Sequence, residues 1–180
     1  MAKSKKIILG VTASIAIYKA CDLLRRLKEP GVCVSVVMTE EAQELIRPVV
    51  FQSLAGNKVY GGALFADSGA WEIEHLSLAE RADLVVVAPA TANIIAKIAG
   101  GICDDLLTCA ICATQAPVLI APAMNEAMYK NKITQGNIKK LKFLGYSFIG
   151  PRQGQLACGK KGIGCLAEVE EIVRAAKRLL

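Results

Sequence analysis

Short aliphatic runs that alternate with helical patterns constrain the fold of this chain more than any other feature. Residues 7–11, 32–38, 84–88 and 118–121 are rich in valine, isoleucine and leucine, which is typical of strands. Hydrophobic residues make up 53% of the chain and aromatic residues only 5%, so the apolar content is aliphatic. Such runs favour parallel strands that helices cover on both faces. The sequence therefore predicts an α/β fold with a doubly wound parallel sheet.

Helical patterns fill the intervals between these runs, over residues 14–29, 40–46, 92–99, 105–113 and 134–144. A further helical turn is expected at Pro48, a short strand at residues 146–149 and a C-terminal helix from Glu168. No repeat or low-complexity linker divides the chain, so we expect a single domain over residues 1–180. Residues 150–166 differ, because they hold five glycines and no sustained period. We expect them to form a loop that acts as a lid or binding flap.

Composition and charge disfavour several classes of protein. No apolar run reaches the ~18–20 residues that span a membrane, and the basic N-terminus lacks a cleavage site, so we expect a cytoplasmic protein without a membrane partner. The seven cysteines are an odd number, mostly in apolar segments, which indicates reduced thiols. Cys103, Cys109 and Cys112 follow an aliphatic helical pattern, so we expect them in the core and predict no metal site. The net charge of +6 is spread over helices and both termini, and we expect no nucleic-acid partner.

Three loops that follow predicted strands carry polar side chains where doubly wound sheets bind ligands. Ser14 opens a helix after residues 7–11, Thr91 and Asn93 open one after residues 84–88, and Asn125 follows residues 118–121. A hydroxyl at a helix start binds phosphate together with free N–H groups, but the same residue also serves as a plain N-cap. The segment Gly10-Val-Thr-Ala-Ser14 matches neither a GxGxxG nor a Walker motif, which disfavours an ordinary dinucleotide or nucleoside triphosphate. Asn125 offers a donor and an acceptor that orient a carboxylate or an amide.

His75 and Cys158 are the two candidate proton-transfer groups. His75 is the only histidine, and it is either a packing residue or a group that accepts a proton near neutral pH. Cys158 differs from the other thiols because it lies in the glycine-rich segment, where an exposed thiol donates a proton more readily than a buried one. The residues alone leave both interpretations of His75 open.

Six motifs occur in order along the chain. They are Ser14-Ile-Ala-Ile-Tyr-Lys19, His75-Leu-Ser-Leu, Ala88-Pro-Ala-Thr-Ala-Asn93, Gly100-Gly-Ile-Cys-Asp-Asp-Leu-Leu-Thr108, Pro122-Ala-Met-Asn125 and Leu156-Ala-Cys-Gly159. In these motifs the chain resembles the flavin-dependent cysteine decarboxylases over residues 6–172, and among them the branch that decarboxylates 4′-phosphopantothenoylcysteine in coenzyme A biosynthesis. The Pro-Ala-Met-Asn and Ala-Cys-Gly motifs are specific, whereas the Ser14 motif is looser.

The resemblance implies a flavodoxin-like three-layer sandwich that binds FMN and assembles as a homotrimer or homododecamer. It assigns cofactor contacts to Ser14, Ile15, Ala16, Thr39, Thr91, Ala92, Asn93, Ile94 and Ala123. It makes His75 the catalytic base, Asn125 the group that holds the substrate carboxylate and Cys158 the proton donor on the flap, with Met128 and Ala157 as further substrate contacts. His75 would then reach a flavin held mainly by a neighbouring subunit. A phosphopantothenate–cysteine ligase, fused or separate, is the implied protein partner.

Residues 162–165 depart from the family pattern, because Gly162-Ile-Gly-Cys165 stands where many bacterial members read Gly-Pro-Gly-Arg. This difference predicts that an anion contact is missing from the flap. Two other functions stay open: a peptidyl-cysteine decarboxylase of lantibiotic maturation, which stops at an enethiol, and a non-catalytic flavoprotein that binds and regulates a protein partner. Cys158 favours the full decarboxylation cycle. A flavin prenyltransferase fits less well, because its pattern does not place a histidine and Pro-Ala-Met-Asn in this way.

Overall fold

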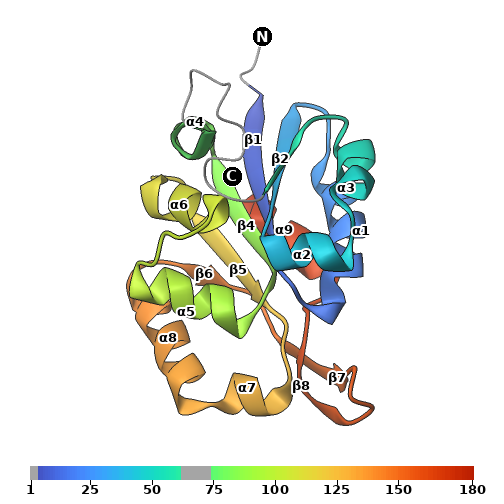
Figure 1. The fold of residues 1–180 in the computed structure, drawn as a ribbon, viewed down its shortest axis with the longest axis vertical. Coiled ribbons are helices and arrows are strands. Elements are labelled where there is room, and N and C mark those ends of the chain that lie inside the picture. Colours follow the sequence, from blue (N-terminus) through green and yellow to red (C-terminus); the bar gives the residue numbers. More distant parts are fainter. Residues whose placement is uncertain (1–3, 62–73) are drawn as a thin grey trace.

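The computed structural model of the protein describes residues 4–61 and 74–180. Within these residues, six parallel strands form one sheet in the order β3-β2-β1-β4-β5-β6 (Figure 1). Every residue of β4 and β5 is buried, as expected for central strands that helices cover on both faces. The strands are β1 (Lys5–Val11), β2 (Val32–Met38), β3 (Val59–Gly61), β4 (Leu84–Ala90), β5 (Val118–Pro122) and β6 (Ser147–Phe148).

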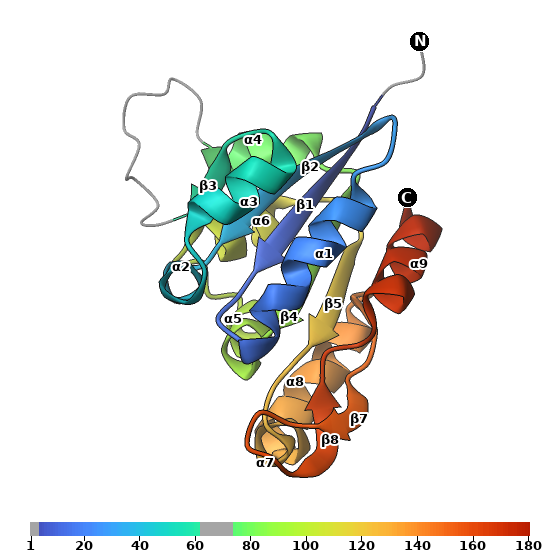
Figure 2. The same cartoon turned by 90° about the vertical axis from the view of Figure 1, so that its right-hand side faces the viewer.

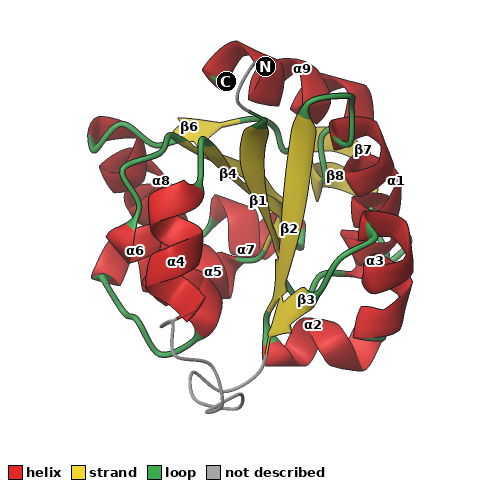
Figure 3. Ribbon diagram, turned by 90° about the horizontal axis from the view of Figure 1, so that it is seen from above, coloured by secondary structure: helices red, strands yellow, loops and turns green. Residues whose placement is uncertain are grey.

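Helices cover both faces of the sheet (Figure 3). The first layer contains the 3-10 turn η1 (Ile15–Ile17), α1 (Tyr18–Leu27), α3 (Pro48–Ala55) and α9 (Val169–Leu179). The second layer contains α4 (Glu74–Arg81), α5 (Ala92–Gly100), α6 (Leu106–Ala113) and α8 (Lys132–Phe143). Two short helices, α2 (Glu40–Leu45) and α7 (Glu126–Lys130), follow the ends of β2 and β5. Successive side chains of a strand join alternate cores, so Leu9 packs in the first layer and Ile8 in the second.

The strand order creates a crevice at the carboxyl ends of β1 and β4. The chain moves outward from β1 to β2 and β3, and then returns to β4 on the other side of β1. Doubly wound sheets bind their ligands at such a switch point. If the three-residue edge strand β3 is set aside, the remaining order is that of flavodoxin. The predicted doubly wound, flavodoxin-like fold is therefore confirmed.

Residues 150–166, predicted as an irregular loop, form an antiparallel hairpin that we call the flap. β7 (Arg152–Gln155) pairs with β8 (Lys161–Cys165), and a turn at residues 157–159 joins them. Figure 2 shows the hairpin beyond the strand ends of the sheet, next to α7. The sequence does not predict these two strands, because three of their residues are glycines and neither strand has a continuous apolar face. β3 and α7 were likewise not predicted.

The prediction that Cys103, Cys109 and Cys112 lie in the core is wrong. Cys103 and Cys112 are exposed, and Cys109 is half-buried. The reason is that α6 packs through other residues, namely Leu106, Leu107, Thr108, Ala110 and Ile111. Although the residue is exposed, partial desolvation of its sulfur, followed by contact with Cys112 and Cys109, raises the pKa of the Cys103 thiol to about 11. The three thiols therefore form a surface cluster rather than part of the core.

Residues 4–61 and 74–180 lack two further features. No helix in this part of the chain is both long and apolar enough to cross a membrane. In the same residues, no group of three or more His, Cys, Asp or Glu side chains is arranged to hold a metal ion.

Candidate active site

A cavity of about 540 Å³ lies at the carboxyl ends of β1, β4 and β5, and the flap forms one of its walls. Its size and its mixture of apolar and polar walls are typical of a small-molecule site. The loops after β1, β4 and β5 and the flap contribute residues 13–16, 18, 19, 91, 92, 123–125, 128, 152, 155–158 and 164–166. The cavity thus occupies the switch point at which the strand order predicts ligand binding.

The loop after β1 holds a hydroxyl at a helix start. Ser14 is the N-cap of η1, and its Oγ accepts a hydrogen bond from the N–H of Ala16 at 3.3 Å. Because the serine oxygen acts as the acceptor in this bond, its own O–H proton is available to a ligand. The N-cap and phosphate-binding interpretations of Ser14 are therefore compatible with each other.

The loop after β4 repeats this arrangement and is tied to the first loop. Thr91 is the N-cap of α5, and its Oγ1 accepts from the N–H of Ile94 at 3.2 Å. The buried hydroxyl of Thr12 donates to the carbonyl oxygen of Pro89 at 2.7 Å and accepts from the N–H of Thr91 at 3.2 Å. Thr12 therefore holds the two loops in register across the crevice, a role that sequence reasoning missed.

The loop after β5 brings Asn125 to the tip of the flap. The Oδ1 atom of Asn125 accepts a hydrogen bond from the N–H of Ala127 at 2.8 Å, which fixes the orientation of the amide. Its Nδ2 atom consequently faces the flap and lies 4.0 Å from the Sγ atom of Cys158. Cys158 sits in a turn that the N–H of Gly159 closes by donating to the carbonyl of Leu156 at 2.9 Å. Two predicted catalytic groups, 33 positions apart in sequence, therefore meet in one cavity.

Two contacts hold β8 of the flap against the loop after β5. The N–H of Met124 donates to the carbonyl of Gly164 at 3.0 Å. The N–H of Ile163 donates to Oε1 of Glu126 at 3.4 Å, and Lys130 forms an ion pair with the same oxygen at 2.8 Å. Lys130 first, and then the N–H of Ile163, lower the pKa of Glu126 below its ordinary value. The ionised carboxylate of Glu126 therefore ties the flap to α7.

Most of the predicted site residues line this cavity. They are Ser14, Ile15, Ala16, Thr91, Ala92, Ala123, Asn125, Met128, Ala157 and Cys158. Three predicted cofactor contacts lie outside its lining: Thr39 is a buried N-cap of α2, Ile94 is buried in the second core, and Asn93 is exposed on α5. The roles assigned to these residues stay predictions.

His75 belongs to α4, but its side chain lies outside the described residues. Among the α4 residues whose side chains the structure describes, 76–81, none lines the cavity. Figures 1 and 2 both place α4 toward the end of the molecule opposite to the flap. Within one copy of the chain, the helix that carries His75 is therefore separated from Asn125 and Cys158.

Sequence reasoning missed several residues of the cavity, including Lys19 and Arg152. Lys19 lies on α1, only five positions after Ser14, and this closeness to a predicted site residue was the sequence signal that could have identified it. Arg152 had no such signal, because its position depends on the strand pairing of the flap. Both cations reach the carboxylate of Glu168, at 3.6 Å from Lys19 Nζ and 2.8 Å from an Nη atom of Arg152.

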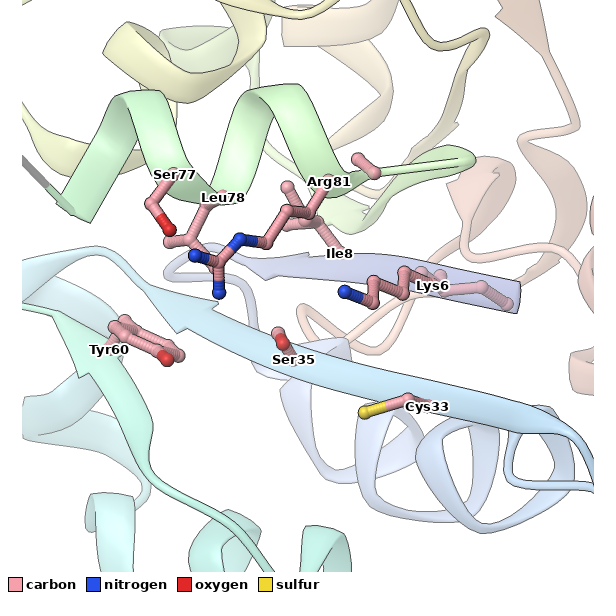
Figure 4. Close-up of a pocket in the computed structure, with 10 residues that line it drawn as sticks. Lys6, Ile8, Cys33, Ser35, Tyr60, Ser77, Leu78 and Arg81 are labelled. Atoms are coloured by element: carbon pink, nitrogen blue, oxygen red, sulfur yellow. The ribbon is translucent and has the colours of Figure 1, made fainter. Parts of the chain in front are cut away.

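A second cavity of about 290 Å³ lies between β1, β2 and α4 (Figure 4). Lys6, Cys33, Ser35, Tyr60 and Arg81 are among its lining residues. None of the predicted site residues with a described side chain lines it, and its walls come from the beginnings of β1 and β2 rather than from their carboxyl ends. This position is unlike that of ligand sites in doubly wound sheets.

Comparison with known proteins identifies relatives over the whole chain. The flavoprotein family model matches residues 1–180. The coenzyme A biosynthesis bifunctional protein CoaBC of Bacillus subtilis is 45% identical over 178 residues, which is 99% of this chain and 44% of the relative. A "probable phosphopantothenoylcysteine decarboxylase" of Streptococcus mutans is 42% identical over 179 residues, which is 98% of this chain and 99% of the relative. The chain thus spans less than half of the bifunctional relative and nearly all of the shorter one.

Solved structures give the same result. A cysteine-to-serine mutant of a PPC decarboxylase, complexed with pantothenoylaminoethenethiol, superposes with a TM-score of 0.86 at 30% identity and covers 97% of both chains. Other neighbours are described as FMN-dependent cysteine decarboxylases or as an FMN-binding protein. The likeness therefore covers the sheet, both helical layers and the flap.

Proposed function

This chain belongs to the flavoprotein family, and from that membership we propose that it is an FMN-dependent enzyme that decarboxylates 4′-phosphopantothenoylcysteine to 4′-phosphopantetheine. The observation that carries the proposal is the approach of Asn125 Nδ2 to Cys158 Sγ, at 4.0 Å, in a cavity whose lining also includes the helix-start hydroxyls of Ser14 and Thr91. Because this chain spans only 44% of the bifunctional relative, the ligase activity of coenzyme A biosynthesis would reside elsewhere, in a fused segment or a separate protein.

The residues of the cavity fit FMN. Ser14 and Thr91 each keep a hydroxyl proton for a phosphate, next to the free N–H groups of two helix starts. Ile15, Tyr18 and Met128 are 66%, 62% and 49% exposed although they are large and apolar, and they surround the cavity. A flat ring would cover such surfaces. FMN supplies, when bound, the hydride acceptor and donor that allow a cysteine-derived carboxylate to leave as CO2.

Asn125 is suited to hold the carboxylate that departs. Its Oδ1 is occupied by the N–H of Ala127, so the Nδ2 protons are the ones that point into the cavity. An amide N–H donates to a carboxylate without adding a positive charge that would hold the anion back. Asn125 therefore orients the carboxylate while leaving the carbon–carbon bond free to break.

Cys158 is suited to donate the proton that replaces CO2. The carbon that receives this proton is bonded to the departing carboxyl carbon, so the donor must lie beside the carboxylate site. The 4.0 Å distance between Cys158 Sγ and Asn125 Nδ2 meets this requirement. In the related PPC decarboxylase, a cysteine-to-serine mutant holds an aminoethenethiol, which is the unsaturated compound expected when such a proton is missing. This likeness supports the same role for Cys158.

The separation of α4 from the cavity supports assembly into a homo-oligomer. If His75 is the base, it acts on a substrate held mainly by a neighbouring copy, because α4 lies toward the end of its own chain that is opposite to the flap (Figure 1). A homotrimer is the smallest assembly that the family resemblance implies, and a homododecamer is the alternative. The seven cysteine thiols are all free, which supports a reducing, cytoplasmic compartment.

Release of CO2 from 4′-phosphopantothenoylcysteine by the FMN-loaded protein tests the proposal, with the product identified by mass. We expect the saturated phosphopantetheine from the native protein and the aminoethenethiol from Cys158→Ser. Release of saturated product by Cys158→Ser at the native rate would contradict the role of the thiol. Turnover of a peptide with a C-terminal cysteine, but not of the phosphorylated substrate, would favour the lantibiotic-type function. A yellow protein that turns over neither would favour a binding role.

A further inference from the structure

Two cations line the flap end of the active-site cavity, and they belong to different parts of the protein. Lys19 comes from α1 in the body of the domain, whereas Arg152 comes from β7 of the flap. Their side chains are 21% and 40% exposed, so both are accessible to a ligand that enters the cavity. The two positive charges therefore face each other across the boundary between the body and the flap.

A single carboxylate bridges these cations in the structure. Glu168 Oε1 lies 2.8 Å from an Nη atom of Arg152, and Glu168 Oε2 lies 3.6 Å from Lys19 Nζ. The Nε–H of Arg152 also donates to the carbonyl of Leu166 at 3.2 Å, which holds the guanidinium at the cavity. Two cations and one carboxylate leave one net positive charge, and the carboxylate side chain is 48% exposed. Because Glu168 is well solvated, its displacement by a more highly charged anion costs little.

The strand pairing of the flap explains how a cation reaches this place. Arg152 is the cross-strand partner of Cys165, the position at which the sequence predicted a missing anion contact. Small neighbours make room for the guanidinium: a Cβ atom placed on Gly154 would lie 3.3 Å from Arg152 Nη1 and 3.0 Å from Cys165 Sγ. The positive charge is thus present on the flap, but on the strand opposite to the expected one. Arg152 is therefore a candidate for the anion contact that the sequence predicted to be missing at position 165.

We propose that Arg152, together with Lys19, binds the terminal phosphate of the substrate and makes the enzyme select phosphorylated over unphosphorylated substrates; this rests on the proposed function. A phosphate monoester carries up to two negative charges and three acceptor oxygens, which suits a planar guanidinium and an ammonium better than one carboxylate does. The phosphate replaces Glu168 between the two cations. Because one cation lies on α1 and the other on the flap, the bound phosphate bridges the two parts of the protein that enclose the cavity.

The test compares 4′-phosphopantothenoylcysteine with pantothenoylcysteine, which differs only in lacking the phosphate. The FMN-loaded Arg152→Gln variant should lose roughly 10- to 100-fold of the native preference in kcat/KM, the effect of one charge-assisted contact. The loss should appear in KM rather than in kcat, because the contact is made equally before and during the reaction. Lys161→Gln is the matched control, since it removes one positive charge from the same hairpin outside the cavity lining.

Two further variants separate phosphate recognition from a structural role of the ion pair. Arg152→Gln combined with Cys165→Arg moves the guanidinium to the cross-strand position and should restore most of the preference. Glu168→Gln removes the competing carboxylate and should leave KM for the phosphorylated substrate unchanged or lower. If the Arg152–Glu168 pair only stiffens the flap, both single variants will instead slow both substrates to a similar degree, and the proposal is overturned.

Two other results would also overturn it. One is a native enzyme that turns over both substrates with equal kcat/KM. The other is a fall in FMN affinity in Arg152→Gln as large as the fall in kcat/KM, because the cations would then serve the cofactor phosphate. A native protein that turns over neither compound would refute the proposed function instead. Calorimetric titration of both compounds into the FMN-loaded protein would still compare their affinities in that case.

Discussion

Replacement of Gly164 by alanine should release the flap from the loop that carries Asn125. Gly164 has a φ angle of +148°, and a Cβ atom built on it would lie 2.1 Å from the carbonyl oxygen of Met124. An ordinary contact between a carbon and a carbonyl oxygen is about 3.3 Å, so the strand must retreat by about 1 Å. The obstructing atom belongs to the backbone, and no side-chain rotation can relieve the clash.

The expected destabilisation of the docked flap is the sum of two free-energy costs. A side chain in this φ region costs about 1–2 kcal/mol. The retreat also breaks the hydrogen bond from the N–H of Met124 to the carbonyl of Gly164, which costs about 1–3 kcal/mol. Together these costs amount to about 2–5 kcal/mol against the docked flap, or roughly 30- to 4,000-fold in its population at 1.4 kcal/mol per tenfold. Because the flap is a separate two-stranded hairpin, the cost falls on local opening rather than on unfolding of the sheet.

Hydrogen exchange and steady-state kinetics measure this effect together. In Gly164→Ala, the amides of β8 and of the turn at residues 157–159 should lose protection, while those of β4 and β5 should not. Decarboxylation should fall because Cys158 no longer stays beside Asn125. FMN affinity should change little if the cofactor contacts lie mainly in the loops after β1 and β4.

Two other glycines of the flap provide matched controls. Gly159 has a φ angle of +81° with no atom within 4 Å of a built Cβ, so Gly159→Ala carries the backbone cost alone. The new Cβ of Gly162→Ala meets the carboxylate end of Glu126, at 2.6 Å from Oε2; that flexible side chain can move at the cost of its hydrogen bond from the N–H of Ile163. The loss of protection should therefore be greatest for Gly164→Ala. Equal protection in Gly164→Ala and Gly159→Ala would refute the reasoning, because the backbone clash would then have no consequence.

Three other predictions concern separate parts of the molecule. Thr12→Val removes the hydroxyl that joins the loops after β1 and β4; it should lower stability by about 1–3 kcal/mol and weaken FMN binding, whereas Thr12→Ser should restore both in thermal melts and FMN titrations. The pKa of Glu126 is lowered, so its contribution to flap docking is present above the ordinary value of 4.5 and is lost as the pH falls through the lowered pKa. Hydrogen exchange at the Ile163 amide, corrected for its intrinsic pH dependence, should become faster over this pH range. In Glu126→Gln this pH-dependent change should be absent. The pKa of Cys103 is raised from 9.0 to about 11, so its thiolate fraction at pH 8 is roughly 100-fold lower and iodoacetamide should alkylate it correspondingly slowly; alkylation at the rate of a free thiol would contradict this.

The parallel sheet could be predicted from the sequence because its signals are local. Residues 32–38 were predicted as a strand with the same ends that β2 has, and β1, β4 and β5 extend their predicted runs by only one or two residues at an end. Strands that are buried on both faces are aliphatic throughout, so the composition of each run indicates that it is buried. Parallel strands also share one carboxyl edge, which is why Ser14, Thr91 and Asn125 could be expected in one site.

The flap and its contacts were decided by tertiary structure. β7 and β8 contain glycines at positions 154, 162 and 164, and the reasons for these glycines are the close approach of Cys165, Glu126 and Met124, which are distant in sequence or on another strand. The cross-strand register places Arg152 opposite Cys165, and no local pattern encodes that pairing. The exposure of Cys103 and Cys112 likewise depends on which side of α6 packs against the sheet.

The candidate catalytic groups divide in the same way. Cys158 was singled out by the composition of its own segment, but its 4.0 Å approach to Asn125 exists only because the flap folds back over the loop after β5. Conversely, the sequence presents His75 as one candidate among these groups, whereas the fold places α4 away from their cavity. Residue type and strand-end position are local properties that a sequence carries. The distance between two loops depends on how all the layers pack, and only the folded chain determines it.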